Sequence, residues 1–409
     1  MFLRWLPFIF IILIVEWYAF QAIKTAFNNK WFLGVYSLIV VMVLGNFFWQ
    51  FFGYDRTEGW THAIAYAIGF FVALASLQIV LFSFLFLEDI MRLLKACIDF
   101  FSSKNTFDIP HRRKFISQIA LGLGAVPFAS LIYGIYQGRY NYKVLNYTLE
   151  YDDLPEKFNG FKITQISDLH CGSFDNFEKV AYGVDLINQQ KGDVILFTGD
   201  LVNSVAKEAA PWVKVFSKIT APFGKFSVMG NHDYGDYTEW ESVSAKEKNL
   251  QDLFKFHKDM GFDLLLNESR KIEKNGEEIA LIGVENWGAG RFKKAGDLNK
   301  SIAKVDKKDF KILLTHDPSH WEAEILPHSY PFHLTLSGHT HGFQFGIEIP
   351  GWIKWSPIKW RYKQWAGIYK NENQVLNVNR GFGYLAYPGR VGIWPEITVI
   401  TLKKKNPLI

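Results

Sequence analysis

The chain has 409 residues, which is room for two or three folding units, and its composition is 49% hydrophobic and 17% aromatic, rich for a soluble enzyme. Its 45 basic and 40 acidic residues leave a formal charge of +5 without a basic stripe interleaved with aromatic residues, so a nucleic-acid-binding protein is excluded. Cys97 and Cys171 are the only cysteines, which excludes a disulfide framework and a thiolate metal site.

Four apolar runs near the amino terminus predict a transmembrane region over residues 1–138. Each run has about the 20 residues that a helix needs to cross a bilayer, and they cover residues 5–23, 31–52, 63–87 and 115–136. A buried soluble bundle is the alternative, but the second run has no polar face to turn towards water. Glu16 lies inside the first run, and we expect it to reach the interface or a neighbouring helix.

Basic residues in the short connections predict the orientation, because they are retained on the cytoplasmic side. The second connection offers only Arg56 beside two acidic residues, whereas Lys24 and Lys30 mark the first. The third connection carries Arg92, Lys95, Lys104, Arg112, Arg113 and Lys114. We therefore expect an integral protein of an inner or plasma membrane, with the lipid bilayer as a partner and everything after residue 138 extracytoplasmic.

The start of the fourth run, HRRKFISQIALGLGAVPFA, resembles a twin-arginine export signal. That resemblance implies export of a folded domain, with its metals acquired before export. The alternative is that Arg112 and Arg113 are ordinary positive anchors, and the sequence leaves both interpretations open.

After Gly138 the hydrophobic residues shorten into strand-length pieces, which predicts a single α/β domain over residues 144–405. Helix-compatible stretches lie between several strands, at 176–190 and 205–219 among others. The near-continuous apolar strands indicate sheets covered by helices on at least one face. The expected strands are 161–167, 193–199, 225–229, 279–284, 310–316, 333–338, 374–379 and 396–402.

Metal-ligand residue types cluster where these strands end. The segments are SDLH, FTGD, MGNHD, LLTH and SGHTH, which supply Asp168, His170, Asp200, Asn231, His232, Asp233, His316, His339 and His341. Carboxylate, carboxamide and imidazole groups suit divalent manganese, iron or zinc. In an extended segment two residues spaced as in Asp-x-His or His-x-His point the same way. The glycines at 199, 230 and 338 are expected to let the backbone turn tightly.

The ordered series Asp-x-His, Gly-Asp, Gly-Asn-His-Asp, His and Gly-His-x-His resembles the calcineurin-like metallophosphoesterase superfamily. The resemblance spans residues 144–403, and the closing NRGFGYLAYPGRVGIWPEITVITL is similar to its membrane-anchored bacterial branch. It implies a two-sheet sandwich flanked by helices, two divalent metal ions, and hydrolysis of a phosphate monoester or diester by a metal-bridging hydroxide.

Carried over residue by residue, the resemblance assigns the metal ligands and the catalytic pair. His232 would stabilise developing charge or protonate the leaving oxygen, and Asp233 would orient it. Asp200 would bridge the two metals. One metal would be held by Asp168, His170, Asp200 and His341, and the other by Asp200, Asn231, His316 and His339.

Two residues depart from the family pattern, and other polar residues allow two interpretations. Asn203 stands where relatives often have a second aspartate, and Phe343 where they often have glycine.

Arg390 would contact a substrate phosphate or form a surface ion pair. The segment 351–365 would dip into lipid headgroups or accept a lipid-like substrate, or else pack its rings on its own sheet. Cys171 and the histidines at 62, 111, 257, 320, 328 and 333 are expected to be packing or surface residues.

The sequence therefore predicts a membrane-anchored phosphoesterase acting on a phosphorylated small molecule or lipid. Two alternatives remain. One is a lipid pyrophosphatase of the type that cleaves UDP-2,3-diacylglucosamine, which the outward topology disfavours. The other is a non-catalytic scaffold, which would be expected to have lost ligands or His232, and none is missing.

Overall fold

The structure, a computed structural model, describes residues 5–27, 29–55, 57, 59–102, 110–349 and 351–405. Contacts divide the chain into two compact units, residues 1–54 with 63–135 and residues 55–62 with 136–409. Arg56, Glu58 and Lys104, which contribute to the topology prediction, lie outside the described residues.

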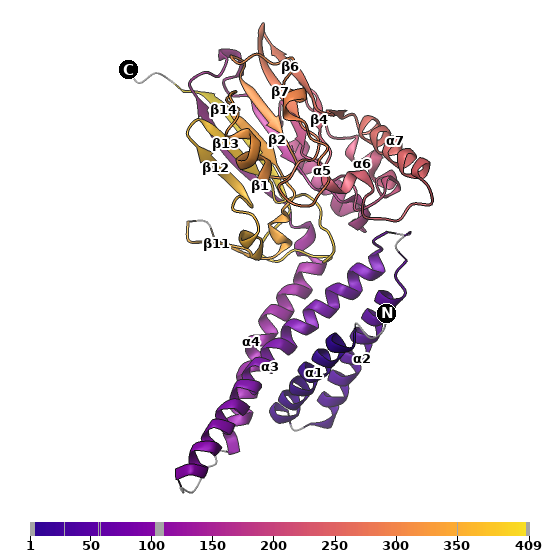
Figure 1. The fold of residues 1–409 in the computed structure, drawn as a ribbon, viewed down its shortest axis with the longest axis vertical. Coiled ribbons are helices and arrows are strands. Elements are labelled where there is room, and N and C mark those ends of the chain that lie inside the picture. The colour runs from indigo at the N-terminus through magenta and orange to yellow at the C-terminus, as the bar shows by residue number, and fades with distance from the viewer. Residues whose placement is uncertain are drawn as a thin grey trace. The chain divides into compact units, whose positions relative to one another are not determined.

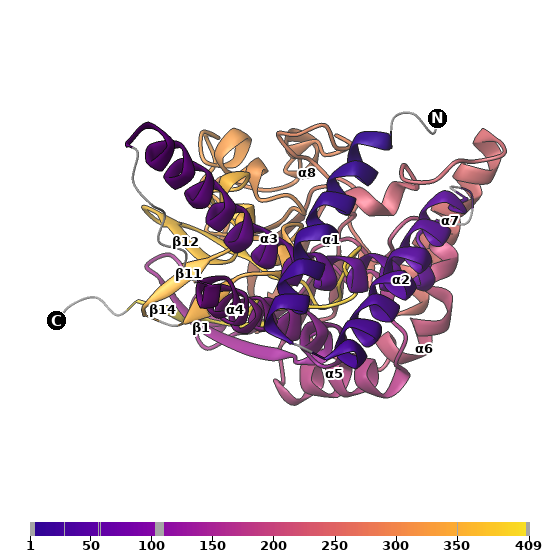
Figure 2. The same cartoon turned by 90° about the horizontal axis from the view of Figure 1, so that it is seen from below.

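The first unit consists of long apolar helices (Figures 1 and 2). They are α1 (Leu6–Ala26), α2 (Lys30–Phe52), α3 (His62–Ser102) and α4 (Pro110–Tyr136), and each is long and apolar enough to cross a membrane. The last two are longer than expected. α3 continues 15 residues past the expected end at 87, because the sequence there keeps good helix formers while gaining charges. α4 begins at Pro110, and proline is favoured in the first turn.

Polar side chains join the helices of this unit. The Glu16 carboxylate accepts a hydrogen bond from the Tyr36 hydroxyl at 3.1 Å and another from the Gln78 amide, so it reaches neighbouring helices as expected. Arg113 forms ion pairs with Asp89 at 2.5 Å and Glu88 at 3.8 Å. One arginine of the pair at 112–113 therefore has a structural partner on α3, whether or not the pair is also an export signal.

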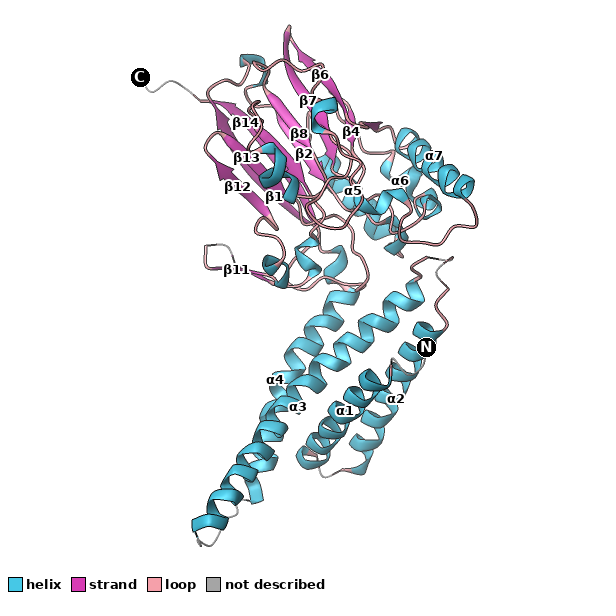
Figure 3. Cartoon of the chain, viewed as in Figure 1, coloured by secondary structure: helices cyan, strands magenta, loops and turns pink. Residues whose placement is uncertain are grey.

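The second unit contains two six-stranded mixed sheets (Figure 3). The first has the order β1 (Lys143–Tyr151), β14 (Glu396–Lys404), β2 (Lys162–Ile166), β3 (Val194–Phe197), β4 (Lys225–Ser227) and β5 (Asp263–Leu264). The second has the order β12 (Gly367–Asn371), β13 (Gln374–Val378), β9 (Leu334–Ser337), β8 (Lys311–Leu314), β7 (Glu277–Gly283) and β6 (Glu268–Lys274). A separate hairpin pairs β10 (Ile347–Ile349) with β11 (Ile353–Trp355).

Alternating side chains on the strands build a layered core, because successive residues of a strand point to opposite faces. Leu196 of the first sheet and Ile312 of the second belong to one buried cluster, which lies between the sheets. Phe197 points the other way, into a cluster shared with α5 (Phe177–Gln189) and α7 (Val243–Asp259). Leu313 points into a third cluster, shared with α8 (Leu298–Ser301). The unit is therefore the expected two-sheet sandwich flanked by helices.

The helix expected over residues 205–219 does not form as one piece. Short 3₁₀ turns at Ala206–Glu208 and Ala210–Trp212 lead into the single-turn α6 (Val213–Phe216). Pro211 accounts for the difference, because proline lacks the N–H that a helix interior needs and its ring clashes with the preceding turn.

Candidate metal centre

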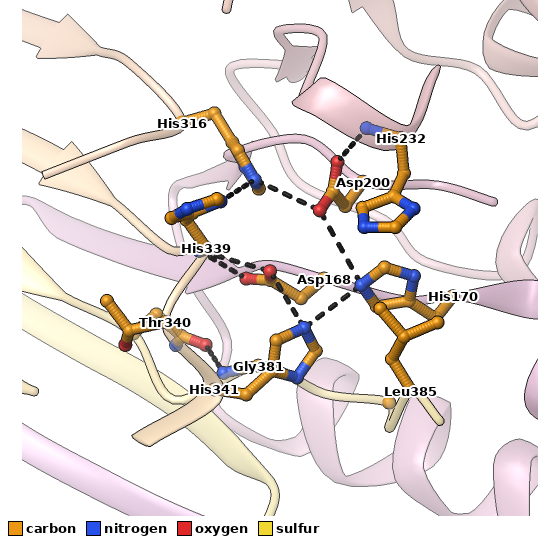
Figure 4. A network of polar contacts seen from close by, with 12 residues as sticks. Asp168, His170, Asp200, His232, His316, His339, Thr340, His341, Gly381 and Leu385 are labelled. Carbon is orange, nitrogen blue, oxygen red and sulfur yellow. Dashed lines mark hydrogen bonds and ion pairs between the residues drawn. The ribbon is translucent and has the colours of Figure 1, made fainter. Parts of the chain in front are cut away.

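The expected ligands converge at the ends of strands from both sheets (Figure 4). Asp168 follows β2, Asp200 follows β3 and Asn231 follows β4, and these three strands are parallel neighbours. His316 follows β8, and His339 and His341 follow β9, which is parallel to β8. Because parallel strands bring their carboxyl ends to one edge, residues as much as 173 positions apart meet in one place.

The first group of ligands consists of Asp168, His170 and His341. One ligand atom from each lies within 4.8 Å of the other two, and all three residues are buried. His341 Nε2 lies 3.0 Å from His170 Nε2 and 3.2 Å from Asp168 Oδ1. Burial raises the pKa of Asp168, but the neighbouring His341 imidazole opposes this and holds it well below its usual value.

The second group consists of Asp200, His316 and His339, again with ligand atoms within 4.8 Å of one another. His316 Nε2 lies 3.0 Å from Asp200 Oδ2 and 3.3 Å from His339 Nδ1. Asn231 joins this group through its side-chain oxygen, 2.8 Å from His339 Nδ1. The Asn231 amide nitrogen donates to the Tyr237 hydroxyl at 2.8 Å, which fixes the amide so that its oxygen faces the histidine.

The ligand atoms of the second group are better placed to bind a cation than to hydrogen-bond with one another. His316 Nδ1 donates a hydrogen bond to the Thr198 carbonyl at 2.7 Å, so the neutral ring presents the lone pair of Nε2 to the Asp200 carboxylate. Two lone pairs at this distance repel unless a proton or a metal ion lies between them. Burial disfavours the charged imidazole, yet Asp200 raises the pKa of His316 to about 10, which shows how strongly positive charge is stabilised there. A divalent ion would replace that proton.

The ligand-bearing backbone is not extended, contrary to expectation. Asp168, His170, Asp200, His339 and His341 have φ values of 51°, 47°, 59°, 70° and 50°, in the left-handed region. For non-glycine residues such conformations cost on the order of 1–3 kcal/mol each and are characteristic of functional sites. The ligand side chains are therefore presented by tight left-handed turns, and not by the two-residue alternation of a strand.

Gly199, Gly230 and Gly338 are required for different structural reasons. Gly199 has a φ of 94° and makes the expected turn before Asp200. Gly230 and Gly338 have no positive φ, but a Cβ atom there would lie 2.1 Å from Asp200 Oδ1 and 2.2 Å from Asp168 Oδ2 respectively. These two glycines allow ligand carboxylates to lie directly against the backbone.

His232 lies beside both groups and is partly exposed. Its ring is 5.0 Å from that of His170, and its backbone N–H donates to Asp200 Oδ1 at 2.9 Å. The Tyr237 ring stacks on the His232 imidazole with the ring centroids 4.3 Å apart. The ring Nδ1 donates to the Asn203 carbonyl oxygen at 2.6 Å, which leaves Nε2 free to face a substrate.

The expectation that Asp233 orients His232 is wrong. The Asp233 carboxylate accepts hydrogen bonds from four backbone N–H groups, those of Asp200 at 2.9 Å, Leu201 at 2.8 Å, Val202 at 3.3 Å and Gly230 at 2.9 Å. Its geometric role is to hold the turn that carries Asp200. The residue that orients His232 is Asn203, through its main-chain oxygen, so aspartate or asparagine at this position leaves the contact intact.

Two residues near His339 were missed from the sequence. The Tyr362 hydroxyl lies 2.8 Å from His339 Nε2 and 3.3 Å from Asp317 Oδ2. When Nδ1 faces a metal, Nε2–H donates to Tyr362, and Tyr362 donates to Asp317. This chain fixes the tautomer of a ligand histidine. Asp317 directly follows His316 in sequence, whereas no local signal marks Tyr362.

Arg390 is neither a surface ion pair nor an exposed phosphate ligand, because it is fully buried. Its guanidinium donates to the carbonyl oxygens of Gly383 at 2.9 Å, Gly381 at 3.3 Å and His341 at 3.4 Å. It therefore braces the loop behind His341. Cys171 is buried in a hydrophobic cluster, as expected of a packing residue.

Some residues of the aromatic segment 351–365 pack on the domain and others are exposed, so neither packing on its own sheet nor contact with lipid accounts for the whole segment. Trp365 is 4% exposed and packs with Ile393, but Trp352 and Trp360 are 77% and 76% exposed. Phe343, Ile347, Ile349 and Ile353 add further exposed apolar side chains nearby in sequence. Packing on its own sheet accounts for only part of this segment.

The fold and the site define a metal-dependent phosphoesterase, and comparisons with known proteins agree. Residues 161–343 match the family described as calcineurin-like phosphoesterase. Residues 3–139 match the family described as probable calcineurin-like phosphoesterase, transmembrane domain.

Full-length relatives show the same relationship. The chain is 31% identical over 301 residues to an uncharacterized metallophosphoesterase of Bacillus subtilis, YkuE, covering 72% of this chain and 98% of that protein. It is 26% identical over 375 residues to a transmembrane protein with metallophosphoesterase domain of Danio rerio, covering 90% of this chain and 79% of that protein. The chain belongs to the calcineurin-like metallophosphoesterase family, and it is a membrane protein.

Proposed function

We propose that this enzyme hydrolyses a phosphate monoester or diester at a centre of two divalent ions, of the manganese, iron or zinc type. One observation carries the proposal: Asp200 Oδ2 lies 3.5 Å from His170 Nε2 in the first ligand group and 3.0 Å from His316 Nε2 in the second. A single carboxylate oxygen thus faces both groups, as a bridging ligand must. Two bound ions would neutralise phosphate charge and make water acidic enough to attack at neutral pH.

The chain's own residues supply proton transfer and positioning. His232 Nε2 points away from its fixed Nδ1 hydrogen bond and can carry a proton to the leaving oxygen. Burial lowers the pKa of His232, and the negative charge of a bound phosphate would oppose that effect and favour the imidazolium form. Asn231 and Tyr237 hold the ligand side of the site in one orientation through their 2.8 Å hydrogen bond.

The test uses the full chain in detergent with manganese and aryl phosphate monoesters and diesters. We expect hydrolysis of at least one of them, and a fall in kcat of roughly 10²- to 10⁴-fold for His232→Ala with metal still bound. The control is His328→Ala, a partly exposed histidine outside the site. If wild type and His232→Ala turned over equally, the assignment of His232 would be rejected, and absence of bound metal in wild type would reject the two-metal centre.

We also propose that the catalytic domain is extracytoplasmic and that its substrate is a phosphorylated small molecule or lipid at the membrane. The support is the excess of basic residues in the first and third connections. A reporter fused after Ile409 that requires the outside environment should be active, and Arg112→Lys with Arg113→Lys tests export by the twin-arginine route. A reporter active only in the cytoplasm would refute this topology and favour a lipid pyrophosphatase acting on a cytoplasmic nucleotide-linked lipid.

A further inference from the structure

A cavity of about 680 Å³ adjoins the second ligand group. Two of its lining residues already belong to the metal centre, since Asn231 faces His339 and Tyr237 stacks on His232. A third, Phe292, lies in the loop between β7 and α8, and its ring is 4.9 Å from that of His339. The cavity is therefore continuous with the place where a phosphate would be attacked.

Three cationic side chains line this cavity: Arg291, Lys293 and Arg361. They come from two segments far apart in sequence, and a Cβ atom on Gly290 would lie 2.9 Å from Arg361 Nη2, so the two segments are in contact. All three side chains are exposed. Among the ion pairs of the described residues, none involves any of the three.

The acidic residue of the cavity does not neutralise them. Asp236 also lines it, but its carboxylate forms an ion pair with Lys246. Lys293 Nζ lies 5.8 Å from the Tyr234 ring and interacts electrostatically with the half-buried Glu285 carboxylate. The Arg361 guanidinium lies 5.8 Å from the Tyr362 ring and also interacts with the hydroxyl of that tyrosine. The three cations outnumber the acidic groups beside them, so the cavity carries net positive charge, and a concave surface concentrates that field on a bound ligand.

We propose that this cavity binds a second phosphoryl group of the substrate, while the first lies at the metal centre. Guanidinium groups match phosphate oxygens with paired hydrogen bonds, and charge-assisted bonds are about twice as strong as neutral ones. Preferred substrates then carry two phosphoryl groups, as a diphosphate does. The inference rests on the proposed function, because the metal centre must hold the other phosphoryl group.

The experiment compares two non-hydrolysable probes, methylenediphosphonate and methylphosphonate, on the full chain in detergent loaded with manganese. Both are measured as inhibitors of aryl phosphate hydrolysis and as ligands by calorimetry. We expect wild type to prefer the diphosphonate by at least roughly tenfold, as expected for one or two added charge-assisted bonds. Because the diphosphonate also chelates metal, the deciding quantity is the change in this preference between variants.

The test variant combines Arg291→Gln, Lys293→Gln and Arg361→Gln, and each single substitution is measured beside it. The matched control is Lys294→Gln, an exposed neighbour whose ammonium lies over Trp287 and does not line the cavity. The preference should fall to about threefold or less in the test variant and stay at the wild-type value in the control. An unchanged preference in the test variant, or an equal fall in the control, would overturn the inference.

The two proposals fail in different ways. If wild type hydrolyses no aryl phosphate, the proposed function is rejected, and the calorimetric preference still decides whether the cavity binds a second phosphoryl group. If hydrolysis proceeds but the preference for the diphosphonate does not depend on the three cations, only the cavity assignment is rejected.

Discussion

His232 Nδ1 donates a 2.6 Å hydrogen bond to the main-chain carbonyl oxygen of Asn203, so the histidine that we propose for proton transfer is oriented by the backbone of a loop. That loop is held in turn by Glu208, whose carboxylate accepts hydrogen bonds from the backbone N–H groups of Asn203 at 2.5 Å, Ser204 at 3.2 Å and Val205 at 3.2 Å. The orientation of His232 therefore depends on Glu208, which holds the loop whose carbonyl oxygen the histidine contacts.

Replacing Glu208 by alanine should lower kcat by about 10- to 100-fold with a smaller change in KM, because a displaced Asn203 carbonyl misplaces His232. Glu208→Gln keeps one acceptor oxygen and should recover part of the loss. The control is Glu178→Ala on the exposed start of α5. Steady-state kinetics with an aryl phosphate checks this, and wild-type kcat in Glu208→Ala would show that the loop holds its shape unaided.

Asp233→Ala should destabilise the protein and weaken metal binding together. Asp233 is 0% exposed, and its loss leaves four buried N–H groups without this acceptor, at about 1–3 kcal/mol each. It also releases the left-handed turn at Asp200. Thermal unfolding in detergent with and without manganese measures both effects. Asp236→Ala, at an exposed ion pair, should change stability by less than about 1 kcal/mol. A wild-type melting temperature for Asp233→Ala would contradict this role.

Metal stoichiometry should follow the two ligand groups. We expect about two divalent ions per chain in wild type, and about one in His341→Ala and in His316→Ala, since each removes a ligand from a different group. Asp200→Ala should lose both, because its carboxylate faces both groups. Elemental analysis of gel-filtered protein measures the counts. One ion in wild type, or loss of one ion only in Asp200→Ala, would argue against a shared carboxylate.

His257 should make the folded state sensitive to acid. Burial lowers its pKa to about 3 from the usual 6.5, so between these values the unfolded chain binds a proton that the folded chain excludes. The stability contribution of neutral His257 is thus fully present above pH 6.5 and is lost as the pH falls towards 3. His257→Gln should remove up to about 1.4 kcal/mol per pH unit from that slope.

Denaturant unfolding at pH 5 to 7 provides the measurement for His257. Some slope should remain in His257→Gln, because burial also lowers the pKa values of His320 and His333. The partly exposed His328, replaced by glutamine, serves as the matched control. An undiminished acid slope in His257→Gln would mean that the folded state accommodates the charge.

The sequence was sufficient to predict which side chains converge, because metal-ligand residue types follow successive strands in a fixed order, and the two-sheet sandwich followed from the family resemblance of that series. Asp168 and His341 can be identified from the sequence because they are metal-ligand residue types that follow apolar strands. The residue that orients His232 cannot be identified in this way, since a carbonyl oxygen is common to every residue and only the fold selects that of Asn203. Tyr362 reaches His339 across an intervening hairpin, so no spacing rule identifies it. The left-handed turns at the ligands were also hidden, because aspartate and histidine carry no conformational signature of the kind glycine does.

The position of strand β14 in the sheet affects when the domain can finish folding during its synthesis. It pairs with β1 on one side and with β2 on the other, so the last strand of the chain fills the gap between the first two strands of the domain. Neither neighbour can acquire its full set of cross-strand partners while the ribosome still holds residues 396–404. The turn after β2, which bears Asp168, is therefore expected to mature only after β14 has been synthesised, and a truncation that removes β14 should disable a centre whose ligands all lie upstream.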